Sequence, residues 1–597
     1  MSSALRRQED GDQESTLRSF RRAIASHLST VFERPVEELL PLVQQNTGHR
    51  RPTHSVFSVV IKRLTSDGGD LDTSTRQRCL DLSTAAAAET REYIVRARET
   101  KDMLLFDPVP LRLIQSAVRR VGARKAAREQ RQDSTRTVLG KRDRTADETV
   151  IVVDGQSVAQ AEESPFCALR RAVLLGFTAR VLQGSFGNPA KVITAESSAG
   201  EGETNSTVKG LYRGLDLHHI DHSIMATDKH LVAIKSAINS TLINASVQDG
   251  FWVSENGDEG AKSHRKLFAV SEDGGFGEPT VLTRTAVLLA RYSEDQEEGR
   301  CIWLTPDRQR AVVDQALDLA KVVFLNVNSD SNNNGNDSSS SITINSTHNS
   351  SQSGRSKDRI RRIEVLYYGP TTGPDLWKDD THLDRSAVGI MEYTTLRMRE
   401  VVAKNRGGAE RTTGLDDDGD DVEGEEDGTG LVLDEAELGR MSRILTESAL
   451  AVASVRCKRI RKLNVDMTRI LDGKGNSGVF LQYVHARLCG IERKSKARLS
   501  LDANLSLVCQ YPEALNLCIV IAEWDDILAA LQATLDPFVL VPYLFHLATE
   551  IGQANHILRV KGMESAVAEA RWLLFWAAKQ VLEEGLQLLG VEFVEHM

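Results

Sequence analysis

The chain has 597 residues and is 41% hydrophobic, so about two to four globular domains are expected. It has no uninterrupted apolar run of about 18 residues, so no membrane span is predicted. The formal net charge is −10, but nine acids and no base lie between Asp416 and Asp427, which leaves −1 for the rest and does not exclude a polyanionic ligand. Seven scattered cysteines without a C-x-x-C pair argue against a zinc ribbon or a disulfide framework, and with a start too polar for a signal peptide they favour the cytoplasm.

Residues 1–145 are expected to form an α+β domain that ends in a basic strip. Apolar residues three or four positions apart between Leu17 and Phe32 predict an amphipathic helix. The β-branched segment 53–64 predicts a strand, and a second helix is expected over 84–99. The strip 112–144 holds 11 Lys and Arg, and it is either a solvated helix or linker or a surface that contacts phosphates.

Residues 146–405 are expected to form an α/β domain. The strand VIVVDG is followed by the helix PFCALRRAVLLGFTARVL, and a further helix is expected over 308–321. Strands that alternate with helices predict a parallel, doubly wound sheet. The other predicted strands are 267–270, 301–304, 322–325 and 363–368.

Two low-complexity segments interrupt the chain. Residues 326–357 are mostly Ser and Asn, with too few apolar side chains to bury a core, and are expected to be a disordered insertion. Residues 406–432 are rich in Gly, Asp and Glu and are expected to be an extended acidic linker.

The last part, 433–597, is expected to be an all-helical bundle with a cationic surface. Apolar residues recur at helical spacing in SGVFLQYVHARLCGIERK, from Ser477 to Lys494, and again from Leu573 to Leu589. Between Arg456 and Arg498 there are 12 Lys and Arg against three acids. Such a surface is typical of phosphate binding, and nucleic acid is its usual ligand.

Two motifs in this last part resemble the C-terminal half of arginyl-tRNA synthetases. One is GN-x-G-x-x-LQY-x-HAR-x-x-x-I-x-RK, and the other is the tail VL-x-x-GL-x-LLG-V-x-x-x-E-x-M. The resemblance covers 466–597 and implies a DALR anticodon-binding domain. The N-terminal region in turn resembles the family's N-terminal additional domain, which implies contact with the tRNA elbow.

The family match and the local charge together give a set of candidate RNA-binding residues. For each of them, helix packing is the competing interpretation. At the position before the final methionine the family usually has an arginine, and His596 stands there instead. The candidates are Tyr483, His485, Arg487, Arg493, Lys494, Asn555, Glu595, Met597, Arg459 and Lys462.

The middle part resembles the Rossmann-like catalytic domain of class I synthetases, but its ATP-handling motifs are changed. The family's H-x-G-H turn matches 165–168, where Pro165 and Ala168 replace the histidines and Cys167 replaces the glycine. The lysine-rich loop keeps only Lys378, among carboxylates. Because these groups stabilise the transferring phosphate, the resemblance predicts a degenerate site, no cofactor and no enzyme activity.

Two further groups of reactive side chains carry no prediction of a site. Cys167 has no paired histidine and is not expected to be a nucleophile. The second group consists of Asp216, His218, His219, Asp221 and His222. For this group, a polar loop is a simpler interpretation than a metal site.

Taken together, the motifs resemble non-catalytic paralogues of arginyl-tRNA synthetase, the eukaryotic DALR anticodon-binding domain-containing protein 3 group. This resemblance implies a cytoplasmic tRNA-binding adaptor that recognises arginine tRNA through the anticodon arm. It also implies assistance to a 3-methylcytidine tRNA methyltransferase, with neither DNA nor a membrane as partner. Two alternatives stay open: an active arginyl-tRNA ligase with a divergent site, and a protein-binding scaffold.

Overall fold

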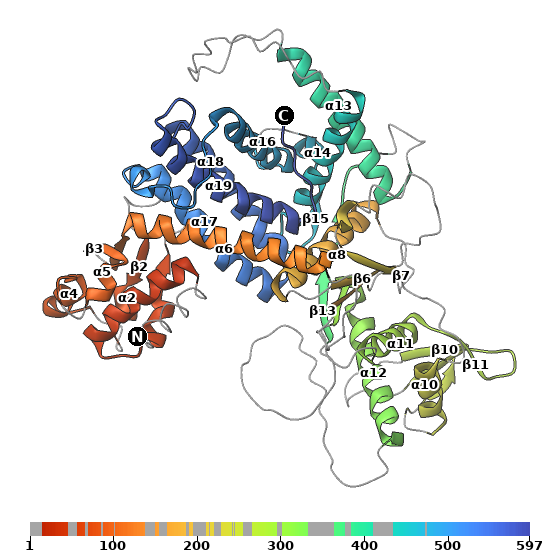
Figure 1. The fold of residues 1–597 in the computed structure, drawn as a ribbon. Coiled ribbons are helices and arrows are strands. Elements are labelled where there is room, and N and C mark those ends of the chain that lie inside the picture. Colours follow the sequence, from red (N-terminus) through yellow and green to blue (C-terminus); the bar gives the residue numbers. More distant parts are fainter. Residues whose placement is uncertain are drawn as a thin grey trace.

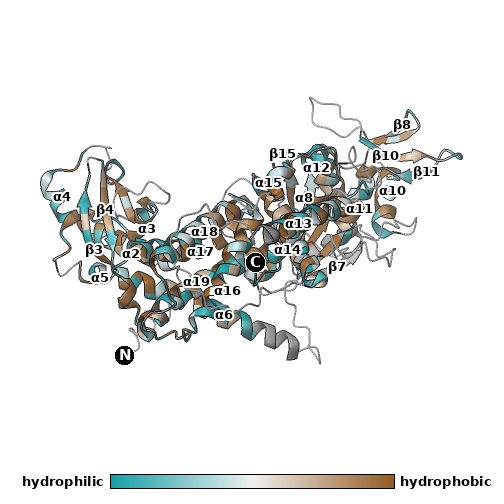
Figure 2. Cartoon of the chain, turned by 90° about the horizontal axis from the view of Figure 1, so that it is seen from above, coloured by the Kyte–Doolittle hydropathy of each residue, from teal (hydrophilic) through white to brown (hydrophobic). Residues whose placement is uncertain are grey.

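The computed structural model contains an α+β N-terminal part, an α/β part and a C-terminal helical bundle, as the sequence predicts (Figure 1). Seen from above, the bundle lies between the N-terminal sheet and a small antiparallel sheet at the opposite end (Figure 2). No helix within the described ranges is long and apolar enough to cross a membrane. The structure describes residues 15–45, 56–65, 70–84, 87–100, 102–137, 150–154, 164–186, 190–194, 210–213, 215–219, 228–240, 243, 245–254, 265–294, 301–331, 363–376, 384–409, 434–471 and 475–597.

The N-terminal part packs a helix on a four-stranded antiparallel sheet of order β1-β2-β4-β3. The predicted helix is confirmed as α2 (Thr16–Phe32), whose first turn is capped by the Ser15 hydroxyl. Phe20 of α2 stacks on Phe57 of β2 with ring centroids 6.0 Å apart. The elements are β1 (Val43–Gln45), β2 (Phe57–Val60), β3 (Ile94–Glu99), β4 (Met103–Pro108), α3 (Val36–Leu39), η1 (Leu40–Leu42), η2 (Ile61–Arg63), α4 (Thr73–Leu80) and α5 (Ala88–Arg91).

The helix predicted over 84–99 is wrong. Among the described residues of this segment, the single turn α5 is the only helix, and the chain then continues as β3, which pairs antiparallel with β4. The alanines at the start of this segment favour a helix, but the β-branched pair Ile94 and Val95 favours a strand. Pairing with β4 decides in favour of a strand, because it provides hydrogen-bond partners for the backbone N–H and C=O groups of the second half of the segment.

Helix α6 (Pro110–Thr137) connects the N-terminal part to the bundle and carries the predicted basic strip. Arg120 and Arg124 both form ion pairs with Asp525 on α17 (Pro512–Thr534). Arg128 pairs with Glu584 on α19 (Ser565–Leu588). These three arginines therefore hold α6 on the bundle rather than forming a free phosphate-binding strip, and residues 138–144 lie outside the described residues.

Replacing Asp525 with alanine is expected to lower the free energy of unfolding by about 2 kcal/mol, because it leaves two partly buried guanidinium groups without their shared carboxylate. Urea unfolding followed by circular dichroism measures the loss. Glu129→Ala is the matched control, since Glu129 forms an exposed i,i+4 pair with Lys125 on the same helix. Equal effects of the two substitutions would show that Asp525 does not anchor α6.

The α/β part is built on a five-stranded parallel sheet of order β13-β12-β5-β6-β7, which confirms the predicted parallel sheet. Among its strands, the inner strand β12 is buried along its whole length, as is typical of a parallel sheet. The strands are β5 (Val150–Asp154), β6 (Ala190–Thr194), β7 (Asp216–His219), β12 (Cys301–Pro306) and β13 (Ile363–Tyr368). The helices and 3-10 turns of this part are α8 (Pro165–Phe186), η5 (Gly210–Tyr212), α10 (Lys229–Asn239), α11 (Val281–Glu294), η6 (Asp307–Gln309) and α12 (Arg310–Ser331).

Two predicted strands are placed differently. The segment 267–270 is a strand, but it belongs to the separate antiparallel sheet β11-β10-β9-β8. The segment 322–325 lies inside α12, because its short apolar run continues a helix that packs on α11. The strands of the second sheet are β8 (Ala245–Gln248), β9 (Phe251–Ser254), β10 (Arg265–Val270) and β11 (Phe276–Pro279).

The predicted insertion and linker lie mostly outside the described residues. Helix α12 continues to Ser331, and residues 332–357 of the insertion are not described. Helix α13 (Ala387–Ala409) includes the first residues assigned to the linker, and 410–432 are not described.

The bundle is the all-helical C-terminal part, and its core is continuous with that of the N-terminal part. Strand β14 (Thr371–Thr372), which follows β13, pairs with β15 (Leu463–Asn464) and joins the bundle to the α/β part. The remaining elements are α14 (Glu435–Val455), α15 (Met467–Leu471), α16 (Gly478–Ser495), η8 (Leu505–Val508), η9 (Pro537–Val539) and α18 (Leu540–Ile557).

Candidate nucleic-acid interface

Helix α16 is the element around which the candidate residues gather. The Ser477 hydroxyl accepts a hydrogen bond from the Phe480 amide at 3.2 Å and caps the helix. Gly478 allows α16 to approach α14, since a Cβ at this position would lie 2.1 Å from the Ser448 carbonyl oxygen. The cap therefore fixes where α16 begins, and the glycine sets how closely α16 packs on α14.

One face of α16 forms a groove with α18. The cavity measures about 300 Å³, and its floor is apolar, formed by Val484, Leu488 and Ile551 among others. Tyr483 stands at the groove with 47% of its surface exposed. Arg487 lines the same groove, and its Nη2 and Nε donate to the Asn555 amide oxygen at 3.0 and 3.2 Å when that amide faces α16.

This arrangement matches the chemistry of an unpaired nucleobase. An exposed aromatic ring and a planar guanidinium offer two stacking surfaces, and the apolar floor accepts the flat face of a base. The Asn555 amide keeps the Arg487 fork in one orientation while leaving donors for a phosphate or a base edge.

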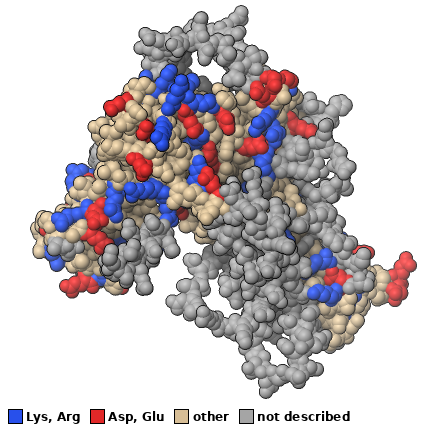
Figure 3. All heavy atoms as spheres, in the orientation of Figure 1, with Lys and Arg blue, Asp and Glu red and all other residues tan. Residues whose placement is uncertain are grey.

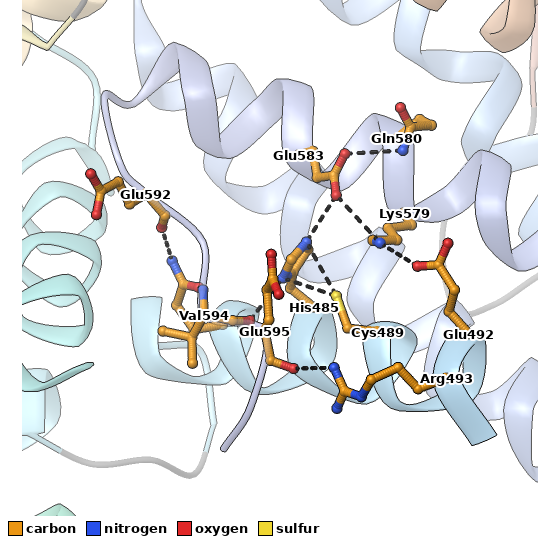
Figure 4. A network of polar contacts seen from close by, with 11 residues as sticks. His485, Cys489, Glu492, Arg493, Lys579, Gln580, Glu583, Glu592, Val594 and Glu595 are labelled. Atoms are coloured by element: carbon orange, nitrogen blue, oxygen red, sulfur yellow. Dashed lines mark hydrogen bonds and ion pairs between the residues drawn. The ribbon is translucent and has the colours of Figure 1, made fainter. Parts of the chain in front are cut away.

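The opposite face of α16 holds the C-terminal tail, residues 591–597 (Figure 4). The buried Gln482 side chain donates to the Glu592 carbonyl oxygen at 2.7 Å and accepts from the Val594 amide at 2.9 Å. His485 Nδ1 lies 2.9 Å from the Val594 carbonyl oxygen, and Arg493 donates to the Glu595 carbonyl oxygen at 3.2 Å.

His485 is an interior residue and does not face RNA as predicted, because its side chain is only 2% exposed. Its Nε2 lies 3.0 Å from the Glu583 carboxylate, so both ring nitrogens face oxygen acceptors. Burial opposes protonation, but contacts with Cys489, Glu583 and the Val594 carbonyl outweigh it and raise the pKa of His485 to about 9. The ring is therefore an imidazolium that donates from both nitrogens at neutral pH.

The remaining candidates divide into exposed and interior groups. Arg493, Lys494, Glu595 and Met597 are exposed, as is Lys462 beside β15. Arg459 is turned inward instead, where it donates to the Tyr367 carbonyl oxygen at 2.8 Å and where burial lowers its pKa. Lys and Arg side chains gather over the area of α16, with acids between them (Figure 3).

A second, larger cavity of about 610 Å³ lies between α14, α15 and α18. Arg456 and His546 line it, together with the apolar side chains of Val452 and Phe545. Thr549 of α18 borders both this cavity and the groove, so the two hollows are neighbours on one surface.

The predicted degenerate positions lie in the first turn of α8, after β5. Cys167 is buried, Pro165 and Ala168 are half-buried, and Lys378 lies outside the described residues. The ring of Phe166 lies against Gly373, where a Cβ would come within 2.4 Å of it.

Arg170, the next residue but one after Ala168, is fully buried and ties this turn to the bundle. It donates to the carbonyl oxygens of Gly369 at 3.1 Å, Arg461 at 3.0 Å and Arg459 at 3.1 Å. These carbonyls lie in the connection between β13 and β14 and in the loop before β15, so Arg170 has a structural role there.

The predicted absence of a metal site is not tested on the cluster that prompted it. Asp221 and His222 lie outside the described residues, and so do the side chains of Asp216, His218 and His219. Within the described part of the chain, no group of three or more His, Cys, Asp or Glu is arranged to hold a metal ion.

Sequence reasoning missed Gln482, Glu583 and Arg170. Gln482 lies inside the LQYVHAR motif, so the motif was a signal for it, but its partners are about a hundred residues away. A buried glutamine or arginine must find hydrogen-bond partners, and the sequence does not show which backbone supplies them.

Comparison with known proteins identifies the C-terminal part. Residues 481–597 match the model of the DALR anticodon binding domain. In overall fold the chain is similar to the arginyl-tRNA synthetase of Thermus thermophilus, with a TM-score of 0.58 at 14% identity over 97% of this chain and 100% of that one. The arginyl-tRNA synthetase of Plasmodium falciparum gives a TM-score of 0.57 at 12% identity over 96% and 99% of the two chains. The predicted synthetase-like fold is thereby confirmed.

Sequence relatives match over a shorter region. The chain is 40% identical over 158 residues to a probable cytoplasmic arginine--tRNA ligase of Dictyostelium discoideum, which is 26% of this chain and 27% of that protein. It is 33% identical over 153 residues to the cytoplasmic arginine--tRNA ligase of Saccharomyces cerevisiae, which is 25% of each. The chain thus spans about a quarter of the length of these relatives. The prediction that the chain is not an enzyme is contradicted by them, since relatives up to 40% identical carry the name of a ligase, which points to an enzyme.

Proposed function

We propose that this chain binds tRNA, and that the α16–α18 groove and the cations around it receive the anticodon arm of an arginine tRNA. The observation that carries the proposal is the groove itself, in which an exposed Tyr483 and a guanidinium stand over an apolar floor. The match of 481–597 to the DALR anticodon binding domain supports RNA as the ligand. The relatives named arginine--tRNA ligase support arginine tRNA as its class.

The mechanism is stacking combined with neutralisation of phosphate. Anticodon bases lie in a single-stranded loop and can be splayed onto aromatic and guanidinium surfaces. The exposed Arg493 and Lys494 near the end of α16 would contact the backbone of the loop and make binding depend on salt.

Aminoacylation is the second candidate function, favoured by the names of the relatives. The relatives named cytoplasmic support a cytoplasmic location.

Assistance to a 3-methylcytidine tRNA methyltransferase also belongs to this proposal and rests on the family resemblance alone. Addition of the chain to such an enzyme would raise its methylation of arginine tRNA if the proposal holds.

The test is a tRNA gel shift over a salt series, with arginine charging measured on the same preparation. Salt-sensitive binding with charging identifies a ligase, and salt-sensitive binding without charging leaves tRNA binding as the function of the surface. No salt-sensitive affinity for any tRNA would contradict the proposal and leave the protein-binding scaffold as the interpretation.

Arg487→Ala is expected to weaken tRNA binding about tenfold, because it removes a stacking surface and a phosphate contact together. Titration of labelled arginine tRNA measures the change. Arg397→Ala is the matched control, an exposed arginine on α13 whose partner is Glu400 on the same helix. A loss of helical circular dichroism that accompanies the loss of binding would instead assign Arg487 to helix packing.

A further inference from the structure

The C-terminal tail is bound to α16 through its backbone. Gln482 contacts it twice, as a donor to the Glu592 carbonyl and as an acceptor from the Val594 amide. His485 forms a hydrogen bond with the Val594 carbonyl oxygen, so side chains of α16 bind both the amide and the carbonyl of Val594. Contacts of this kind fix position without depending on the tail's own side chains.

Other elements support the same contacts. His485 is oriented from α19 by Glu583, which lies 3.8 Å from Lys579, and Lys579 in turn pairs with Glu492 of α16 at 2.7 Å (Figure 4). Phe593 packs on the His485 ring with centroids 5.0 Å apart. From the α/β part, Arg213 pairs with Glu592 at 3.2 Å. The tail is therefore held directly by α16 and by Arg213, and α19 supports it indirectly by orienting His485.

The result of these contacts is the placement of the last residues. Arg493, on the exposed end of α16, donates to the Glu595 carbonyl oxygen, and the chain from Glu595 to Met597 is exposed beside it. The tail end and the cationic end of α16 thus form one continuous surface.

We propose that Gln482 and His485 are positioning residues for RNA binding, because they fix the tail so that Glu595–Met597 form part of the RNA-contacting surface. The inference rests on the proposed function and deepens it, since it extends the RNA-contacting surface from the groove, past the cationic end of α16, to the tail on the opposite face of that helix. Neither anchor touches RNA.

The charged groups around His485 make the anchor sensitive to pH. Glu583 and Lys579 face it from α19, Cys489 and Glu492 belong to α16, and the tail contributes the Val594 carbonyl and carries the acidic residues Glu592 and Glu595. Loss of the second ring proton would leave one of the two oxygen acceptors without a donor and loosen the tail.

The test compares four chains for tRNA affinity: wild type, a truncation lacking 595–597, Gln482→Ala, and the truncation combined with Gln482→Ala. The truncation and Gln482→Ala are each expected to weaken binding about tenfold, and the combination to be no weaker than the truncation, because coupled changes are not additive. Hydrogen exchange of the Val594 amide in the free proteins should accelerate in Gln482→Ala, which shows that the tail has been released while circular dichroism reports an intact bundle.

A pH series separates positioning from a purely structural role. Between about pH 7 and about pH 9, the tRNA affinity of the wild type should fall more steeply than that of the truncated chain. The truncated chain is the reference because its affinity reports the effect of titrating the RNA itself. His485→Gln should follow the truncated chain.

The outcomes differ for the two proposals. If wild type binds tRNA and the truncated chain binds equally well, or if Gln482→Ala weakens the truncated chain further, the positioning role is overturned and the proposed function stands. If wild type binds no tRNA, both fall.

Discussion

Replacing Arg170 with alanine is expected to destabilise the chain by about 3 kcal/mol, because it leaves several buried carbonyl oxygens without the charged donor that they share. The side chain is fully buried, and its loss leaves the carbonyl oxygens of Gly369, Arg459 and Arg461 without this donor. Because those carbonyls belong to the connection between the sheet and the bundle, the two parts should loosen from one another.

Urea unfolding followed by circular dichroism measures the loss, and limited proteolysis reports where the chain opens. Arg170→Lys should recover little, since an ammonium group cannot reproduce the planar fork. Lys458→Met is the matched control, an exposed side chain in the loop that Arg170 holds. An Arg170→Ala chain as stable as this control would contradict the assigned role.

Stability is also expected to fall by about 3 kcal/mol as the pH rises from about 6.5 to about 9, owing to His485. The pKa of this buried ring is raised from 6.5 to about 9, so the folded chain keeps a proton that the unfolded chain releases in this window. The stabilisation is complete below about pH 6.5 and is lost as the pH rises through about 9.

Urea midpoints measured across that range test the expectation, with His485→Gln as the comparison because it cannot titrate. The wild-type curve should descend relative to that of the variant. Parallel curves would mean that His485 is not protonated in the folded state.

Local patterns allowed much of the fold to be predicted. The strands at 301–304 and 363–368 and the helix at Ser477–Lys494 are encoded by composition and period within one segment, and each is found in the structure. The apolar run 322–325 is compatible with a strand or a helix, and the structure places it within α12. The periodicity of such a short apolar run does not distinguish a strand from a helix.

The candidate site was predicted only in outline. Exposure of Tyr483 and Arg487 on one face of α16 follows from helical spacing, since these residues are four positions apart. The interior position of His485 does not, because the carbonyl and the carboxylate that hold it are 109 and 98 residues away. Arg459 was assigned by charge, but its side chain is used to join the sheet to the bundle.

The central claim is that the α16–α18 groove is an RNA-binding surface. Its most direct test is the affinity for arginine tRNA, measured against salt concentration for the wild-type chain and for Arg487→Ala. We expect a steep fall in affinity with salt and about tenfold weaker binding by the variant at each salt concentration. Salt-independent or absent binding by the folded wild-type chain would contradict the claim.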